Sequence, residues 1–567
     1  YIAPRTSLEH ALAQCFASVL GLERVSIFDN FFALGGHSLL ATQLVSRLRE
    51  ALSVELPLRT LFDAPSVASL AEALQEDSSG QPSALPPLQA LDRPARLPLS
   101  FAQERLWFLE QLNPGQSTYN IPVALRLSGA LDVPAFQAAL NALVARHESL
   151  RTSFAQHDGQ AVQRIAAQLQ LTLALSVLDT LAPDAQAAEV RRLAQVEATR
   201  AFDLQHGPLL RAQLLRLAQD QHVLLFTMHH IVSDGWSTGV LVRELGACYT
   251  AALRNEPLAL PPLAVQYADY TLWQRDWLAG AELERQSQYW RTQLAGLAPL
   301  DLPTDRARPA QISGRGATLP FAVRAELYQR MNALAQREGV TPFMLVLAVF
   351  QTLLARLSGQ SEVAVGSPIA NRTHAQIEPL IGLFVNTLVL RADLSGTPSL
   401  RELLAQVRDT TLAAYAHQDL PFEKLVEALA PVRDTSRTPL FQVMLVLQNA
   451  PMEPLALPGL TLELLPAAEA GAKFDLTLSL THKQDGLAGS FSYATDLFDT
   501  LTIARLGERF TRLLEQALEQ PDAPLHALEL VLPEEHALLE RWNDTAAPYP
   551  EHLCIHQLFE QQVQRTP

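Results

Sequence analysis

The stretch at residues 223–237 reads Val-Leu-Leu-Phe-Thr-Met-His-His-Ile-Val-Ser-Asp-Gly-Trp-Ser, and it decides how the rest of the chain is interpreted. Its apolar start predicts a buried strand, which is followed by two histidines and an Asp-Gly turn pair. Because side chains alternate faces along a strand, His229 and His230 are expected to point in opposite directions. This geometry argues against both histidines binding one metal ion. Histidine titrates near neutral pH, so a reactive site and a merely hydrogen-bonded strand end are both open here.

Length and composition predict several domains. The chain has 567 residues, 48% of them apolar, which is too many for one ordinary core. No segment approaches 18 uninterrupted apolar residues, so no membrane span is expected. The net charge of −16 comes without a basic stripe, which disfavours nucleic acid and anionic membranes as partners. Three distant cysteines lack metal-ligand spacing and favour reduced thiols in a cytoplasmic protein, and the absence of a start methionine suggests a piece of a longer chain.

The first eighty residues predict a small helical bundle. Apolar residues recur at helical spacing over residues 8–20, 40–48 and 67–74. A Gly-Gly pair precedes the second of these helices, and Ser38 is predicted to be its N-cap. Residues 79–97 are rich in serine, glycine and proline and predict a linker. In the larger region that follows, two helices are predicted at residues 325–338 and 342–358.

Several motifs resemble those of nonribosomal peptide synthetases. The run His229-His230-Ile-Val-Ser-Asp-Gly235 resembles the HHxxxDG signature of condensation domains. The run at residues 30–40 resembles the carrier-protein motif in which the serine after Gly-Gly-His carries 4′-phosphopantetheine. Six further runs are similar to condensation motifs in the order of that family. They lie at residues 100–109, 146–154, 267–274, 381–391, 417–423 and 433–440.

The resemblance implies a multidomain fold. A small all-α four-helix carrier bundle is expected at residues 1–78. An α/β, chloramphenicol-acetyltransferase-like condensation domain is expected to follow, with lobes at residues 98–272 and 273–530 and a tunnel between them. Residues 531–567 resemble the linker that leads into an adenylation domain.

The implied reaction is peptide-bond formation between two carrier-bound acyl groups, with 4′-phosphopantetheine attached covalently to Ser38. His230 is expected to face the tunnel. It either acts as general base on the attacking amine or orients that amine by hydrogen bonding, and the sequence leaves both roles open. Gly235 is expected to let the backbone approach the substrate, with its amide contacting the thioester oxygen.

The neighbours of these residues are expected to be structural. Asp234 lies four residues beyond His230, past a turn, so we expect its carboxylate to point away from the imidazole. The resemblance implies that Asp234 pairs with Arg372, and His229 is assigned to structure. The residues expected to line the tunnel are Asn449, Trp236 and Ser237.

Rival functions share some of these motifs. An epimerization domain carries HHxxxDG too, but the Gly-Gly-His carrier motif, the run at 382–387 and the adenylation-like tail argue against it. A heterocyclization domain would carry aspartates in place of the histidine pair, and a dual epimerization/condensation domain would show an extra early histidine motif. A non-catalytic platform that recruits tailoring enzymes is opposed by the intact histidine motif. The expected partners are a downstream acceptor carrier, flanking adenylation domains and a phosphopantetheinyl transferase.

Overall fold

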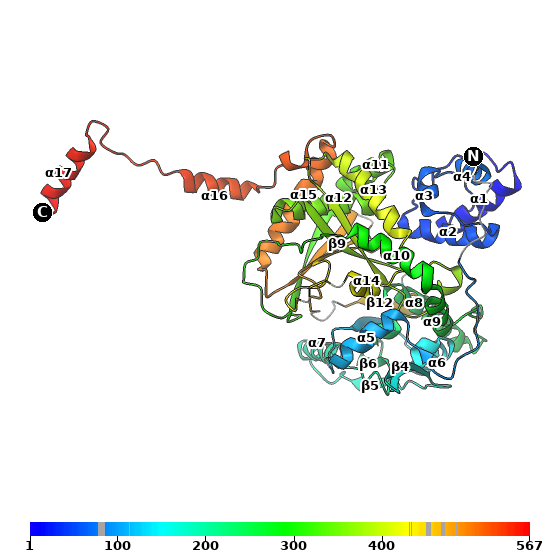
Figure 1. Ribbon diagram of the computed structural model, residues 1–567. Coiled ribbons are helices and arrows are strands. Elements are labelled where there is room, and N and C mark those ends of the chain that lie inside the picture. The colour runs from blue at the N-terminus through cyan, green and yellow to red at the C-terminus, as the bar shows by residue number, and fades with distance from the viewer. Residues whose placement is uncertain are drawn as a thin grey trace.

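The computed structural model describes residues 1–76, 85–112, 114–429, 431–432, 434–448, 455–465, 471–483 and 486–567. A small helical domain lies against a larger two-lobed domain, and two further helices extend away from both (Figure 1). The predicted tunnel residue Asn449, Arg433 of the last motif and residues 77–84 of the expected carrier end and linker lie outside the described residues.

The N-terminal domain is a bundle of four helices around a core of fully buried apolar side chains. Its first helix ends where Gly21 adopts a left-handed conformation, φ 67°, which glycine tolerates without steric cost. The helices are α1 (Ser7–Leu20), α2 (Ser38–Leu52), α3 (Leu58–Asp63) and α4 (Val67–Glu76). The central core residues are Leu12, Phe16, Phe31, Leu44 and Leu70.

The start of α2 differs from the prediction by one residue. His37, not Ser38, is the N-cap, and its ring Nδ1 accepts a hydrogen bond from the Leu40 amide at 3.5 Å. Histidine supplies the acceptor that the first-turn amides need, so Ser38 becomes the first helical residue. The Ser38 hydroxyl is therefore not used for capping.

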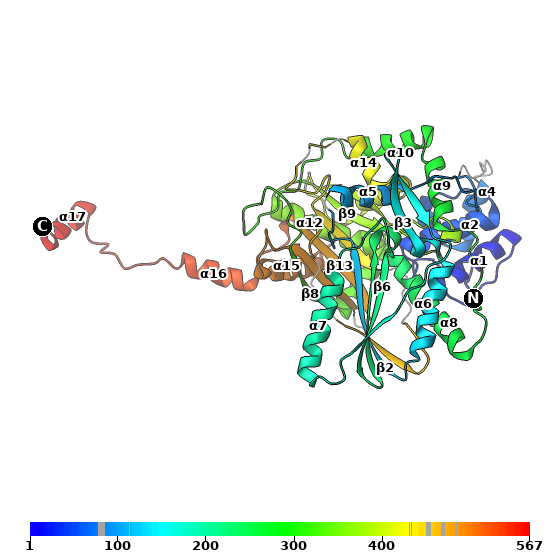
Figure 2. The ribbon, with the colours of Figure 1, turned by 90° about the horizontal axis from the view of Figure 1, so that it is seen from below.

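The first lobe is built on a five-stranded sheet of order β12-β2-β7-β6-β5. The apolar run before the histidines forms central strand β7, buried over almost its whole length. Helices α6 and α8 pack on one face of the sheet and α7 on the other (Figure 2). The strands are β2 (Asn120–Gly129), β5 (Ala174–Val177), β6 (Leu210–Ala218), β7 (Gln221–His229) and β12 (Leu460–Leu464), and the helices are α6 (Val133–Arg146), α7 (Pro183–Thr199) and α8 (Gly235–Arg254).

The second lobe has a six-stranded sheet of order β10-β9-β11-β13-β14-β8. Its most buried helix, α12, follows an apolar run and is covered on nearly all sides. The strands are β8 (Gly316–Arg324), β9 (Glu362–Ile369), β10 (Asn386–Asp393), β11 (Val443–Gln448), β13 (Leu476–Lys483) and β14 (Gly486–Ala494). The helices are α11 (Ala325–Arg337), α12 (Pro342–Ser358), α13 (Leu400–Tyr415) and α15 (Thr500–Glu519).

The two lobes are not strictly consecutive in sequence. Strand β12 comes from the second half of the chain but pairs antiparallel with β2 of the first lobe. The predicted boundary between residues 272 and 273 falls inside helix α9 (Tyr267–Trp277). The lobes are thus joined by a shared sheet as well as by the chain between them.

The remaining elements complete the frame. A three-stranded sheet joins β1 (Leu97–Pro98), β4 (Gln160–Ile165) and β3 (Thr152–His157). Helices α5 (Phe101–Leu112), α10 (Gly280–Gln293) and α14 (Phe422–Leu429) lie around the lobes, while α16 (Pro533–Asn543) and α17 (Ile555–Arg565) extend away (Figure 1). Across the described ranges no single helix is both long and apolar enough to cross a bilayer; the bent pair α11 and α12 meets the length and composition test together.

Candidate active site

The two histidines at the end of β7 have different environments. His229 is only 3% exposed, and its ring lies 5.9 Å from Phe202 and 6.5 Å from Tyr119, measured between centroids. Its Nδ1 accepts a hydrogen bond from the Ile231 amide at 3.1 Å. His230 begins a short 3-10 turn and lines a cavity of about 320 Å³ between the lobes. The strand alternation therefore places one ring in the core and the other at a cavity.

Burial keeps both imidazoles neutral. Desolvation lowers the pKa of His230 to about 4, with a further lowering from the positive charge of Lys473 and an opposing effect from Asp234. Desolvation likewise lowers the pKa of His229 to about 3. The Nδ1 atom of His230 is buried and makes no hydrogen bond to the described residues. A neutral ring at pH 7 retains a lone pair that can accept a proton.

Asp234 is held by the second lobe rather than by His230. The predicted Asp-Gly turn is instead the start of α8, with Asp234 as N-cap and its Oδ1 accepting from the Ser237 amide at 2.8 Å. Its Oδ2 accepts from the amides of Phe384, at 2.9 Å, and Val385, at 3.3 Å. The carboxylate is therefore occupied by donors from both lobes.

Arg372 completes this buried contact. Its Nη2 lies 3.2 Å from Asp234 Oδ1, and the two side chains are 1% and 2% exposed. Its Nη1 donates to the carbonyl oxygens of Ile377, at 2.5 Å, and Leu380, at 2.8 Å. The guanidinium also lies 4.1 Å from the ring centroid of Phe384. The structure thus brings together the Asp–Arg pair that the resemblance implies, and it places the pair in a structural network.

The residues that follow Asp234 lie differently around the cavity. Gly235 is exposed and lines the cavity, and a methyl group added there would contact nothing within 4 Å. As the first residue of α8 it has an amide without an intrahelical acceptor. Trp236 also lines the cavity, and its indole donates to the Glu378 carbonyl at 2.9 Å. Ser237 does not line this cavity: it is fully buried and accepts from the Gly382 amide at 3.0 Å.

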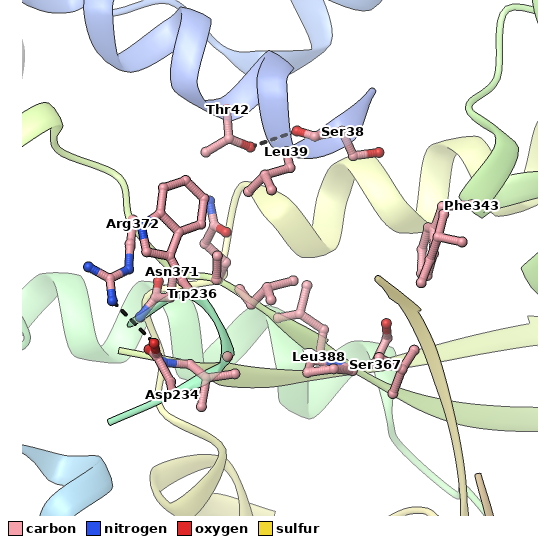
Figure 3. A pocket seen from close by; sticks show the side chains of 18 of the residues that line it. Ser38, Leu39, Thr42, Asp234, Trp236, Phe343, Ser367, Asn371, Arg372 and Leu388 are labelled. Carbon is pink, nitrogen blue, oxygen red and sulfur yellow. Dashed lines mark hydrogen bonds and ion pairs between the residues drawn. The ribbon is translucent and has the colours of Figure 1, made fainter. Parts of the chain in front are cut away.

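The carrier domain closes one end of the cavity. Ser38, Leu39 and Thr42, at the start of α2, line the same cavity as His230 (Figure 3). The strands β9 and β10 of the second lobe form another wall. A covalent 4′-phosphopantetheine fits this arrangement because the hydroxyl that would carry it opens onto a space leading to the imidazole.

Arginine–carboxylate pairs surround this carrier contact. Arg47 lies 3.5 Å from Glu378, measured between Nη2 and Oε2. Two pairs run in opposite directions between α3 and α13, with Arg59 of the carrier 2.8 Å from Asp409 and Asp63 of the carrier 2.6 Å from Arg408. None of these residues belongs to a local motif, so no sequence signal could have identified them.

A two-lobed α/β domain whose cavity joins a neutral histidine to the serine of a docked carrier defines an enzyme that acts on carrier-bound substrates. Residues 95–540 match the family model described as "Condensation domain", and residues 10–74 match "Phosphopantetheine attachment site". The chain therefore belongs to the condensation-domain family of nonribosomal peptide synthetases. It is a carrier–condensation didomain, and the reaction of its condensation domain is the formation of a peptide bond.

Curated relatives agree over the whole chain. It is 48% identical over 565 residues to a linear gramicidin synthase of Brevibacillus parabrevis, covering 99% of this chain and 11% of that protein. It is 44% identical over 585 residues to a dimodular nonribosomal peptide synthase of Bacillus subtilis (strain 168), covering 100% of this chain and 24% of that protein. The chain thus spans about a tenth to a quarter of the length of these relatives.

Solved structures agree with the fold. The X-domain in the complex of the X-domain and OxyB from teicoplanin biosynthesis is 33% identical, with a TM-score of 0.72, covering 79% of this chain and 99% of that chain. The four-domain synthetase AB3403, bound to AMP and glycine, is 24% identical, with a TM-score of 0.72, covering 84% of this chain and 37% of that chain. The second likeness supports the fold alone.

Proposed function

We propose that the carrier in this position is the donor, and that His230 is the central residue of condensation. The observation that carries the proposal is that Ser38 and His230 line one cavity. The carrier also precedes the condensation domain along the chain, as expected of the domain that delivers the upstream acyl group. The 4′-phosphopantetheine on Ser38 supplies a flexible thiol that carries this acyl group as a thioester.

The chain's own residues account for the other requirements of the reaction. The amine of a downstream aminoacyl group forms the new C–N bond as the C–S bond breaks, and a proton passes from the amine to the leaving sulfur. The low pKa of His230 leaves its ring free to take this proton or to orient the amine by hydrogen bonding. The Gly235 amide is placed to donate to the thioester oxygen, on which negative charge develops. Asp234 and Arg372 hold the start of α8 in place.

The partners that this role requires are a downstream acceptor carrier, flanking adenylation domains and a phosphopantetheinyl transferase. We place the reaction in the cytoplasm. Free thiols at Cys15, Cys248 and Cys554 are consistent with that compartment.

The test is single-turnover condensation by the didomain with Ser38 loaded and an aminoacylated acceptor carrier added. His230→Ala is expected to lower the rate by about 10²–10⁴-fold while leaving the urea unfolding midpoint near that of the wild type. The matched control is His206→Ala, since His206 is an exposed histidine of the same lobe. A His230→Ala rate close to that of the wild type would overturn the assignment.

A further inference from the structure

The hydroxyl of Ser38 lies between two hydroxyls of the second lobe. Ser38 Oγ donates a hydrogen bond to Thr341 Oγ1 at 3.4 Å, and the Tyr415 side chain is also hydrogen-bonded to Ser38. Thr341 is 1% exposed and is the N-cap of α12, while Tyr415 is the last residue of α13. Two separate helices therefore present a polar atom to one oxygen of the carrier.

That oxygen is the attachment point of the prosthetic group. In the modified carrier Ser38 Oγ is an ester oxygen of a phosphodiester, so it loses its proton and gains a singly charged phosphate one bond away. The free phosphate oxygens then lie within reach of the hydroxyls that now contact Ser38. Threonine and tyrosine hydroxyls can both donate to such oxygens, and hydrogen bonds to a charged acceptor are the stronger kind.

The surroundings of the two hydroxyls suit an anion. Burial raises the pKa of Tyr415 to about 12, so its hydroxyl keeps the proton that it would donate. Thr341 Oγ1 accepts from the Met344 amide at 3.3 Å, which leaves its own proton available for a phosphate. The 17-residue helix α12 begins here, and its dipole adds to the attraction for negative charge. Tyr415 and Phe343 line the cavity that reaches His230, so the arm has room to continue.

We propose that Thr341 and Tyr415 bind the phosphodiester on Ser38 and direct the pantetheine arm along the cavity toward His230. They are positioning residues, and this proposal rests on the proposed donor role of the carrier. It implies that docking depends on the modification state: the phosphodiester gains two charge-assisted hydrogen bonds in place of the weaker contacts of the bare serine. The modified carrier therefore docks more tightly than the unmodified one.

Three variants separate this role from simple packing. Thr341→Ser keeps the hydroxyl and the cap. Thr341→Asp keeps a favourable N-cap but puts a negative charge beside the phosphate. Tyr415→Phe removes one hydroxyl and leaves the ring. If Thr341 were only a cap, the aspartate variant would behave like the wild type.

The direct readout is the ³¹P NMR signal of the phosphodiester in the modified, full-length didomain. A bound phosphate gives a shifted, broad resonance, and a free arm gives a narrow one. We expect the wild type and Thr341→Ser to show the bound signal, and Thr341→Asp and Tyr415→Phe to move to the free signal. A Thr341→Asp or Tyr415→Phe spectrum identical to that of the wild type would overturn the proposal.

Condensation kinetics provide the second readout. With the donor loaded on Ser38, Thr341→Asp is expected to lower kcat by roughly tenfold, the equivalent of losing one charge-assisted hydrogen bond, without changing KM for the acceptor carrier. An unchanged kcat or a raised KM for the acceptor would count against the role.

A charge reversal at the dock, Arg408→Glu, separates the two proposals. If this variant leaves the phosphorus signal of the wild type unchanged, the carrier does not dock here and the donor assignment fails too. If Arg408→Glu frees the arm but Thr341→Asp and Tyr415→Phe do not, only the phosphate-binding proposal fails.

Discussion

The cavity is bounded by two contacts that are built in opposite ways. Where the carrier meets the second lobe, the paired side chains are open to water: Arg59 and Asp409 are 46% and 65% exposed. Where the two lobes meet, Arg372 and Asp234 are 1% and 2% exposed. Exposed pairs contribute about 0.2–1 kcal/mol, whereas removing one partner of a buried pair costs about 3–5 kcal/mol. The first contact is suited to exchange and the second to permanence.

Backbone pairing strengthens the contact between the lobes. Strand β12 crosses from the second half of the chain and joins the sheet of the first lobe beside β2. The segment at 381–385 is fixed to the first lobe by hydrogen bonds to Asp234, Ser237 and Ser149, the last donating to the Ile381 carbonyl at 2.7 Å. The lobes can therefore bend relative to each other, but separating them would break main-chain hydrogen bonds.

The largest expected effect is at Asp234. Asp234→Ala leaves Arg372 buried without its partner and removes the acceptor of the Phe384 and Val385 amides. We expect a loss of about 3–5 kcal/mol in the free energy of unfolding, measured by urea titration. Asp409→Ala is the control and should cost no more than about 1 kcal/mol. A stable Asp234→Ala variant with no activity would instead make Asp234 a chemical participant.

Gly382 provides a steric test of the same contact. A methyl group at Gly382 would lie 2.2 Å from the Tyr267 ring, so Gly382→Ala is expected to cost about 1–3 kcal/mol of stability. Gly235→Ala is the matched substitution on the cavity side, where a methyl group meets nothing within 4 Å. Its unfolding midpoint should stay near that of the wild type. Equal destabilisation by the two alanines would contradict the difference between the lobe contact and the open cavity.

Acidification probes the interior of the first lobe. The pKa of His229 falls from about 6.5 when unfolded to about 3 when folded, so the unfolded state binds the proton first. Stability is therefore complete above pH 6.5 and is lost as pH falls toward 3, by about 1.4 kcal/mol for each unit. His229→Gln should show a shallower decline in the free energy of unfolding between pH 6 and 4. An identical slope would show that His229 is already protonated in the folded protein.

The smallest effect is expected at the carrier contact. A double-mutant cycle of Arg59→Ala and Asp409→Ala should give a coupling energy of about 0.2–1 kcal/mol for docking, and added salt should reduce it. The population of the docked state can be followed by the phosphodiester resonance of the modified protein. A coupling above about 2 kcal/mol, or one that salt does not change, would mean that this contact is as permanent as the one between the lobes.

Local sequence patterns predict the elements well. The apolar run before His229 forms the central strand β7, and the helices expected at 325–338 and 342–358 are present as α11 and α12 within one residue. Alternation along β7 also predicts that the two histidines differ in environment. These features depend on neighbouring residues, so a short window contains the information.

Features that depend on distant residues escape prediction. The pairing of β12 with β2, the burial of Ser237 and the contacts of Thr341 and Tyr415 with Ser38 all join segments far apart in sequence. The predicted cap of α2 is wrong because a serine beside a glycine pair is a common cap, while here the ring of His37 takes that role. No periodicity in a single sequence contains such information.

The burial of Ser38 has one more consequence. In the docked carrier this serine is only 8% exposed, with its hydroxyl directed at the second lobe. An enzyme that attaches the prosthetic group must surround that hydroxyl, so it can act only on molecules whose carrier has swung clear. The speed of activation is then limited by how often the carrier is free, and any substitution that loosens the dock should make the chain mature faster.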